Sequence, residues 1–311
     1  MSAKWPWLVL VLTACVDPDA PNGKQGVLFF RPESADPVAV GLEANLTLLG
    51  ETPRSTFNFA DTTLEVEASP GVSVVEKRQV PLFEGGLSYQ LAYRCESAGS
   101  RELRVRVLDR NKGPRYSDAF DVACATPANL GQEYVGANDA GPLPGGYFLV
   151  GARIQITLKV TDRNERALAG RGLVELVDEQ GVTRPMPGGI HHPGRSLYLE
   201  ALKPGEGLRV RLAGLEAPLP VHVVEDTAIT LELGVQHRAG TGWSAIADAR
   251  HIPTAHRVGG LEPCTWDVRF ASGTVLEEQG KCYRTIPDTL GAGTVCVSSH
   301  GHRTCADFPS R

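Results

Sequence analysis

The sequence has few of the large side chains that a helical bundle would pack. Its 311 residues include only 9 Phe, 7 Tyr, 4 Trp and 2 Met, against 34 Gly and 22 Pro. This balance argues against a large helical protein and favours short strands joined by turns. Hydrophobic residues make up 42% of the chain, which is enough for packed cores and excludes disorder along its whole length. The composition therefore predicts an all-β protein.

Catalytic signatures and an excess of basic charge are also missing. The sequence contains no P-loop, no dinucleotide-binding glycine motif after a strand and no H-E-x-x-H pair. Ser244 stands in Gly242-Trp-Ser-Ala-Ile, which lacks the second Gly of a nucleophile elbow. The net charge of −5 gives no support to nucleic-acid binding. We therefore expect a protein that is not an enzyme, needs no cofactor and has no nucleic-acid partner.

No apolar run in the sequence is long enough to cross a membrane. Near the start, one Lys precedes an apolar run of about ten residues, which is typical of a secretory signal peptide. The run ends in Leu12-Thr13-Ala14-Cys15, which resembles the lipobox of bacterial lipoproteins. The resemblance implies that residues 1–14 are a signal peptide and that Cys15 is acylated, with palmitate among the acyl chains. The alternative is an ordinary or uncleaved signal peptide with a coincidental Cys.

The residues after the lipobox indicate where the protein is held. Several acyl chains give stable attachment, so the membrane is one expected partner. Val16, not Asp, follows the Cys, which by the rule of that family implies the outer membrane, facing the periplasm or the cell surface. Residues 15–26 are polar and rich in turn formers, so they predict a lipidated Cys on a flexible tether. We expect the remainder of the chain to be soluble.

Strand-like alternation recurs in three similar blocks. Leu103–Leu108 and Leu208–Leu212 both alternate apolar residues with Arg, and each lies between a strand-like run with a Gly-rich turn and a closing strand. A looser third copy is centred on Thr294–Ser298. This recurrence predicts three β-sandwich domains at residues 27–126, 127–225 and 226–311.

The front of the second copy resembles bacterial immunoglobulin-like domains of the invasin/intimin type. Ile154–Asp162 is an alternating strand that ends in Asp, and a short turn and a second strand, Leu173–Val177, follow it. The third copy shows the same order, with Thr265–Phe270 as its strand. The resemblance covers roughly residues 140–308. Together with the recurrence of three blocks, it implies three tandem immunoglobulin-like β-sandwich domains after the signal peptide and the tether.

Six Cys residues remain after Cys15, and an even number in an exported chain predicts disulfides. The absence of C-x-x-C argues against zinc. Correspondence between the copies predicts Cys95–Cys124 in the first domain and two bonds, Cys282–Cys305 and Cys264–Cys296, in the third. The competing scheme joins Cys264 to Cys282 and Cys296 to Cys305, where the second bond would clip a hairpin.

Two further groups of residues are candidate binding sites. Arg104, Arg106, Arg209 and Arg211 project from the polar faces of their strands and would suit an anionic partner, because the guanidinium fork matches phosphate and carboxylate. The alternative is a solvated strand face. His300 and His302 are spaced so that two imidazoles of one strand share a face and could hold a metal, or they are exposed turn residues. We expect no metal.

These patterns lead to one functional hypothesis and one alternative. The first is a non-enzymatic envelope lipoprotein that presents or spaces a domain binding an unknown protein or glycan, as in adhesion. The alternative is a structural accessory subunit of an envelope or secretion machine.

Overall fold

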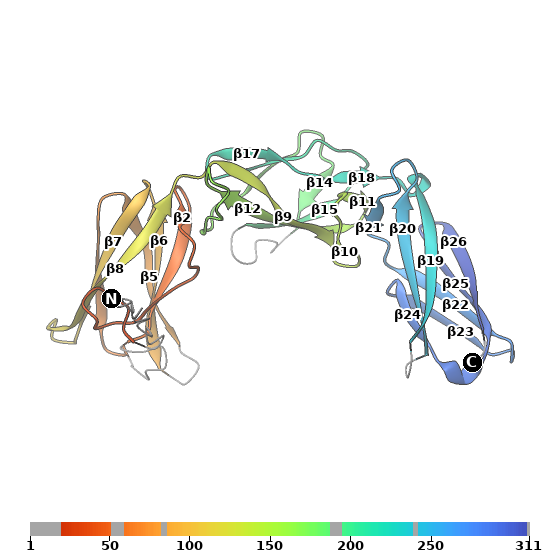
Figure 1. Cartoon of the computed structure of the whole chain (residues 1–311), viewed down its shortest axis with the longest axis horizontal. Helices are drawn as coiled ribbons and strands as arrows, with labels where there is room; N and C mark the ends of the chain where they lie inside the picture. Colours follow the sequence, from red (N-terminus) through yellow and green to blue (C-terminus); the bar gives the residue numbers. More distant parts are fainter. Residues whose placement is uncertain (1–19, 51–58, 82–85, 187–194, 239–241, 310–311) are drawn as a thin grey trace, which may run out of the picture. The chain divides into compact units, whose positions relative to one another are not determined.

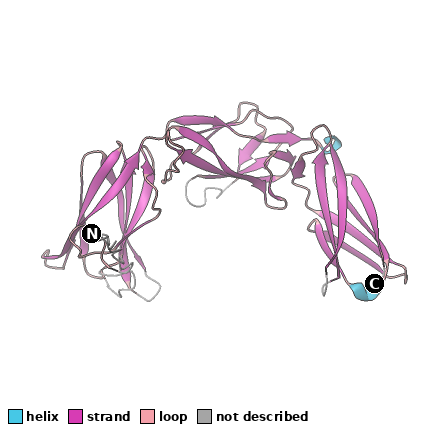
Figure 2. Ribbon diagram, viewed as in Figure 1, coloured by secondary structure: helices cyan, strands magenta, loops and turns pink. Residues whose placement is uncertain are grey.

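The computed structural model describes residues 20–50, 59–81, 86–186, 195–238 and 242–309. These residues form β-strands and two short 3-10 turns, η1 (Asp226–Ala228) and η2 (Asp288–Leu290), and hold no α-helix (Figure 2). Within this part of the chain, no helix has the length and apolar character needed to cross a membrane. The predicted all-β, immunoglobulin-like fold is confirmed.

The chain divides into two compact units, residues 1–125 and 126–311 (Figure 1). Three domains, with a further boundary between residues 225 and 226, stay a prediction. The first unit contains two four-stranded sheets. One sheet has the order β1 (Phe30–Pro32), β3 (Glu43–Leu48), β6 (Leu87–Cys95), β5 (Val72–Pro81). The other has the order β2 (Val38–Ala39), β8 (Pro114–Ala125), β7 (Gly99–Leu108), β4 (Thr63–Ala68).

Alternation along β7 builds the core of the first unit. Leu103, Val105 and Val107 are fully buried, whereas Arg104 and Arg106 between them are exposed. Successive side chains of a strand point to opposite faces, so each apolar residue enters the core and each Arg faces solvent. The predicted period of two is therefore present in the strand.

The described residues of the second unit form four sheets. The first has the order β10 (Gly141–Pro142), β9 (Asn129–Ala137), β12 (Arg153–Thr161), β15 (Ser196–Ala201), β14 (Thr183–Pro185). A three-stranded sheet has the order β13 (Glu175–Val177), β16 (Arg209–Leu212), β17 (Leu215–Pro218). A larger sheet has the order β18 (His222–Val224), β11 (Tyr147–Leu149), β21 (Arg257–Gly259), β20 (Gly242–His251), β19 (Ile229–Arg238), with β24 (Tyr283–Ile286) also on β20. The last has the order β23 (Val275–Gly280), β22 (Cys264–Phe270), β25 (Gly293–Ser299), β26 (His302–Phe308).

Strand β11 connects the predicted second and third domains. It lies between β18 and β21 and pairs with both in parallel, so β18 and β11 belong to the same sheet as β19, β20 and β21 (Figure 1). A backbone ladder therefore runs through the place where the sequence predicts a domain boundary. This shared sheet explains why residues 126–311 form one compact unit.

The described part of the chain holds three disulfides. Cys95 is bonded to Cys124, as in the predicted pair, and the bond joins β6 and β8 of opposite sheets. The predicted pairing of the other four Cys is wrong. Cys264 is bonded to Cys282, and Cys296 is bonded to Cys305, as in the competing scheme.

Strand alternation gives the physical reason for this correction. Val295 and Val297 are fully buried, so Cys296 between them faces outward. Phe308 is buried, and Cys305 lies three residues before it, on the opposite face of β26. The two Cys residues are directly opposite each other in the β25–β26 register. An outward Cys305 cannot reach a sulfur on the inner side of the sandwich.

Asp118 fixes the start of the folded chain. Its carboxylate is 2% exposed and accepts four backbone N–H groups. Oδ1 accepts those of Gln25 (2.8 Å) and Ala119 (2.7 Å). Oδ2 accepts those of Val27 (2.9 Å) and Leu28 (2.8 Å). One buried carboxylate thus satisfies donors of a segment that precedes the first strand.

Neighbouring contacts extend this attachment toward the N-terminus. The Asn22 side chain donates to Phe30 O and accepts from Phe30 N, each at 2.7 Å. Lys24 forms ion pairs with Glu102 and Asp121. A Cβ added at Gly23 would lie 2.1 Å from Asp118 Oδ2, so the backbone approaches the carboxylate too closely for a larger residue. The predicted tether ends at Gly26, whereas the structure holds the chain against the first unit from Asn22 on.

We expect Asp118→Asn to lower the free energy of unfolding of the first unit by about 2–4 kcal/mol. The Asn amide nitrogen is a donor, and in either orientation it would face two backbone donors that then lose their acceptor. Urea unfolding of the full chain, followed by far-UV circular dichroism, measures the loss. Asp121→Asn is the matched control, because this residue of the same strand is half exposed and should cost under about 1 kcal/mol. Equal effects of the two variants would contradict the assigned role of Asp118.

Candidate functional site

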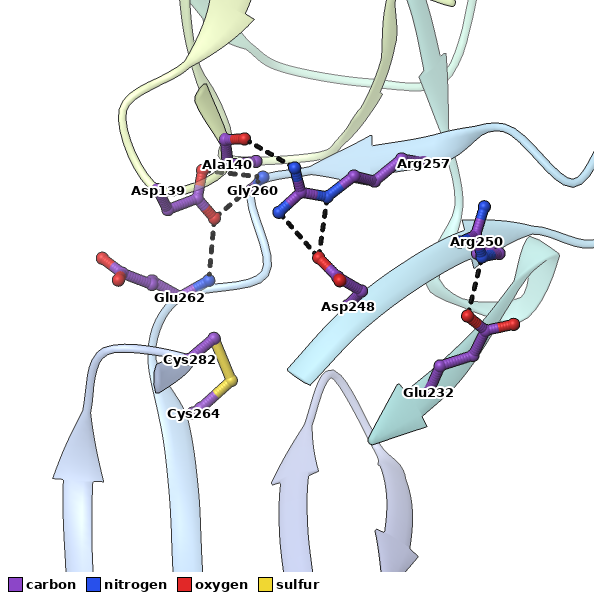
Figure 3. Close-up of polar contacts among 10 residues, drawn as sticks. All are labelled: Asp139, Ala140, Glu232, Asp248, Arg250, Arg257, Gly260, Glu262, Cys264 and Cys282. Atoms are coloured by element: carbon purple, nitrogen blue, oxygen red, sulfur yellow. Dashed lines mark hydrogen bonds and ion pairs between the residues drawn. A yellow bond between two sulfur atoms is a disulfide. The ribbon is translucent and has the colours of Figure 1, made fainter. Parts of the chain in front are cut away.

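A polar junction lies where the turn after β9 meets the segment after β21 (Figure 3). Both carboxylate oxygens of Asp139 accept the Gly260 N–H, at 3.2 and 3.1 Å. Oδ2 also accepts the Glu262 N–H at 3.2 Å. These bonds join segments more than 120 residues apart in the sequence. They lie beside the β11–β21 pairing, so the same place is fixed by backbone ladder and by side chain.

Arg257 adds a second connection at this junction. Its guanidinium donates to Asp248 on the neighbouring strand at 2.7 Å and to the Ala140 carbonyl at 3.0 Å (Figure 3). Ala140 directly follows Asp139, so two consecutive residues of one turn accept hydrogen bonds from residues 257–262. Two Gly residues allow the close approach. A Cβ at Gly259 would lie 2.5 Å from Leu143 Cδ1, and Gly260 has a φ of +92° that side-chain-bearing residues rarely adopt.

Three His side chains surround Tyr147 in the same shared sheet. The Tyr147 ring stacks on His222 of β18 (centroid distance 4.8 Å) and on His251 of β20 (4.6 Å). The His256 ring meets it edge-on at 5.3 Å. Burial lowers the pKa of His251, and the neighbouring His256 and His222 lower it further. The packing therefore favours a neutral imidazole at the centre of this cluster.

Other polar groups face the Tyr147 cluster as well. Glu206 lies 2.7 Å from His222 Nδ1, and Thr254 Oγ1 lies 2.9 Å from His251 Nδ1. Arg250 bonds to Glu232 and to the carbonyl of Ala255 in the loop before His256. A carboxylate therefore contacts His222, and a cation paired with Glu232 bonds to the residue before His256.

The predicted Arg sites face carboxylates, in two places that belong to different units. Arg104 bonds to Glu102 at 2.5 Å, and it lies opposite Glu67 in the β4–β7 register. Arg106 lies opposite Glu65. On the β16–β17 pair, Arg211 bonds to Glu216 at 2.7 Å and lowers the pKa of its carboxyl group.

Arg209 is held in the same way, at 3.0 Å from Glu179 and 3.2 Å from Glu216. The acidic neighbours of these four Arg residues come from the same strand, from adjacent strands and from a turn. An anionic partner would have to compete with those carboxylates.

His300 and His302 lie at the β25–β26 turn, next to η1. His300 and Gly301 both have positive φ, at 48° and 76°, which a two-residue type I′ turn requires. His300 Nδ1 is 3.0 Å from Asp226 Oδ1, and its Nε2 is 3.1 Å from Gly260 O. His302 Nε2 is 2.8 Å from the Asp226 carbonyl. The two imidazoles do not share a strand face, since His300 is in the turn, and both bond to Asp226.

Two further findings concern predicted sites. Cys15, the predicted lipidation site, lies outside the described residues. Among the described residues, no three His, Cys, Asp or Glu side chains gather in a way that could hold a metal ion.

Sequence reasoning missed the residues that make the junction. Asp139 follows a strand in Asn138-Asp-Ala-Gly141, which reads only as a turn. Tyr147 and its three His neighbours come from three separate segments: β11, β18, and the end of β20 with the turn that follows it. Their proximity could be predicted only from the parallel pairing of β11. This strand is three residues long, which is too short to give a clear sequence pattern.

Comparisons with known proteins add likeness of fold only. No protein-family model matches the sequence, and no curated protein is similar to it. Domains 5–6 of the S-layer protein SbsC share 14% identity, with coverage of 64% of this chain and 98% of that chain, at a TM-score of 0.28. InvD of Yersinia pseudotuberculosis shares 12% identity, with coverage of 88% and 94%, at a TM-score of 0.25. A marsupial T cell receptor shares 9% identity, with coverage of 91% and 98%, at a TM-score of 0.22.

We expect Asp139→Ala to open the junction locally. The Gly260 and Glu262 amides lose their acceptor, at a cost of roughly 1–3 kcal/mol. Hydrogen exchange on the full chain should become faster at residues 257–262 and stay unchanged in residues 20–125. Asp162→Ala is the matched control, because the Asp162 carboxylate accepts the amides of Asn164 and Arg166 within its own turn. Unchanged exchange at Gly260 would refute the assigned role of Asp139.

We also expect the second unit to lose stability on acidification because of His251. Its pKa is lower in the folded chain than in the unfolded chain, so folding favours the neutral imidazole. This stabilisation is fully present above the unfolded pKa of about 6.5 and is lost as the pH falls through the folded pKa. Urea midpoints between pH 8 and pH 5 should therefore decline less in His251→Gln than in the unsubstituted chain.

Trp fluorescence makes the urea measurement specific to the second unit. After removal of residues 1–14, the remaining Trp residues are Trp243 and Trp266, so Trp fluorescence follows residues 126–311. His237→Gln is the control, because that imidazole bonds to Asp288 away from Tyr147. Parallel pH profiles for His251→Gln and the unsubstituted chain would show that His251 is not responsible.

Proposed function

We propose that this protein is a non-enzymatic lipoprotein of a bacterial cell envelope. In this proposal, acyl chains on Cys15 hold it at the outer membrane, and its β-sandwiches present a domain that binds a protein or glycan partner. The observation that carries the proposal is the lipobox, Leu12-Thr13-Ala14-Cys15, placed directly before a chain of immunoglobulin-like sandwiches.

The start of the folded chain supports this arrangement. Seven residue steps separate Cys15 from Asn22, and an extended chain of that length spans at most about 25 Å. From Asn22 on, the chain is held by Asp118, Phe30 and Glu102. An acylated Cys15 would therefore keep the first unit close to the lipid surface, on a shorter connection than the sequence predicts.

The second unit supports a presenting role. A spacer can hold its far end at a fixed distance only if the connections within it are rigid. The shared sheet, Asp139 and Arg257 supply three such connections in the second unit. The Cys264–Cys282 and Cys296–Cys305 disulfides further stabilise the predicted third domain, residues 226–311. We propose that the partner binds to this domain.

Lipidation is tested by changing the lipobox Cys. Expressed in a bacterial host and labelled with a fatty acid, the protein should incorporate label and sediment with outer membranes. Cys15→Ser should lose the label and accumulate as a heavier precursor, because cleavage of a lipoprotein signal follows acylation of its Cys. Ser2→Ala, within the signal peptide, is the control and should behave as the unsubstituted protein. Labelling that persists in Cys15→Ser would overturn the lipid anchor.

Protease treatment of intact cells then separates display from an internal role. Cleavage within residues 226–311 supports presentation at the surface. Protection in intact cells, with cleavage after lysis, would favour the accessory subunit of an envelope or secretion machine.

A further inference from the structure

The Cys296–Cys305 disulfide occupies a different position from the other two. Cys95–Cys124 joins strands of opposite sheets, and Cys264–Cys282 joins β22 to the bend between β23 and β24. Cys95, Cys124 and Cys264 are at most 5% exposed. Cys296–Cys305 instead joins neighbouring strands, at directly opposite positions with a Cα–Cα distance of 4.0 Å. It lies on the outward face, and Cys305 is exposed on β26, the edge strand of its sheet.

The β25–β26 hairpin is stabilised by other interactions besides this disulfide. Strands β25 and β26 pair at seven positions, and the His300-Gly301 turn has the backbone conformation that a two-residue hairpin needs. Their inner face packs Val295, Val297 and Phe308 into the core. The bond closes a separation of only nine residues, against 29 for Cys95–Cys124. A short loop loses little chain entropy on closure, so the bond adds less to stability than the longer ones do.

Arg303 makes the two sulfurs unequal. It lies opposite Ser298 of β25, yet its Nη2 is 3.0 Å from Asp267 Oδ2 on β22, beyond β25. Asp267 is itself opposite Cys296. The Arg303 side chain must therefore cross β25 beside Cys296 to reach its partner. Cys296 is only 8% exposed although it faces outward, which agrees with this path of the Arg303 side chain.

We propose that Cys305 is a site of thiol–disulfide exchange with a dithiol reductant. A reductant thiolate attacks Sγ of Cys305 and forms a mixed disulfide with it, while the bond to Cys296 breaks and Cys296 leaves as a thiolate. The second thiol of the reductant, as a thiolate, then attacks the reductant sulfur of the mixed disulfide, and Cys305 leaves as a thiolate. The dithiol is thereby oxidised to a disulfide, Cys296 and Cys305 are reduced by two electrons, and the two protons of the dithiol pass to solvent or to the new thiols.

Each feature of the site has a part in this reaction. Exposure of Cys305 admits the attacking thiolate, whereas cover by Arg303 protects Cys296 from attack. The guanidinium beside Cys296 stabilises the negative charge that develops on the leaving sulfur. The hairpin stays paired through the cycle, so reduction and reoxidation are reversible without unfolding.

The order of reduction tests the site. The purified full chain, without denaturant, is treated with dithiothreitol, and samples are quenched with acid, alkylated and mapped by mass spectrometry. Cys296 and Cys305 should become alkylated at least ten times faster than the other four Cys residues, with no change in far-UV circular dichroism. A single common rate for all three bonds, or loss of the β spectrum in step with reduction, would overturn the proposal.

The direction of attack gives a second, independent readout. With glutathione as a monothiol probe, the trapped adduct should lie on Cys305 and not on Cys296. Arg303→Gln should slow formation of the adduct several-fold, and Arg303→Lys should restore part of the rate because it keeps the charge. Arg269→Gln is the matched control, because Arg269 binds the same Asp267 from its own strand without crossing β25. An adduct on Cys296, or equal rates in the Arg303 and Arg269 variants, would refute the assignment.

Discussion

The two-residue period of the strands is the constraint on which the rest of this structure depends. A strand residue that enters the core forces its neighbours to the surface. In β7 the period buries Val105 and exposes Arg104 and Arg106, and the same register brings Glu67 and Glu65 of β4 opposite these cations. One geometric rule therefore produces both the core and the paired charges on its outer face. It also explains why the Arg side chains face carboxylates, although the sequence alone presents them as a basic strip.

The same period determines which Cys residues of the last four can pair, and the sequence itself shows it. In Thr294-Val-Cys-Val-Ser298, two Val residues on one face place Cys296 on the other. Correspondence between the repeated blocks points to a different pairing, because it places Cys305 where the first block has Cys124. In the first block Cys124 shares its buried face with Val122. In the third, Phe308 takes the buried face and Cys305 is turned outward. Local alternation is the stronger guide, because a one-residue shift between blocks reverses the face.

Long-range polar contacts lie beyond this kind of prediction. The strands themselves are visible as alternating runs, and the all-β fold follows from them and from the Gly and Pro between them. Asp118, by contrast, is one polar residue in a strand, and the segment that it holds ends about 90 residues earlier in the chain. Asp139 similarly meets amides more than 120 residues away. Neither contact has a local pattern, since any exposed loop could supply the donors. The parallel pairing of β11 is hidden for the same reason, because three residues carry too little periodicity.

Asp118 and Asp139 have the same structural role, one in each unit: each accepts hydrogen bonds from backbone amides of a non-strand segment. Residues 22–28 and 260–262 run beside sheets without joining them as strands. The amides of Gln25, Val27 and Leu28 in the first segment, and of Gly260 and Glu262 in the second, bond to a carboxylate. A carboxylate with two acceptor oxygens can satisfy several such donors at once and leaves no room for the segment to shift, since each amide must stay within hydrogen-bond reach. Glycine at 23 and at 260 lets the backbone approach. The first carboxylate fixes the chain where the proposed lipid tether begins, and the second fixes it beside the shared sheet. Both carboxylates hold backbone amides, so a change at either Asp removes the acceptor of several donors at once, whatever side chains those donor residues carry.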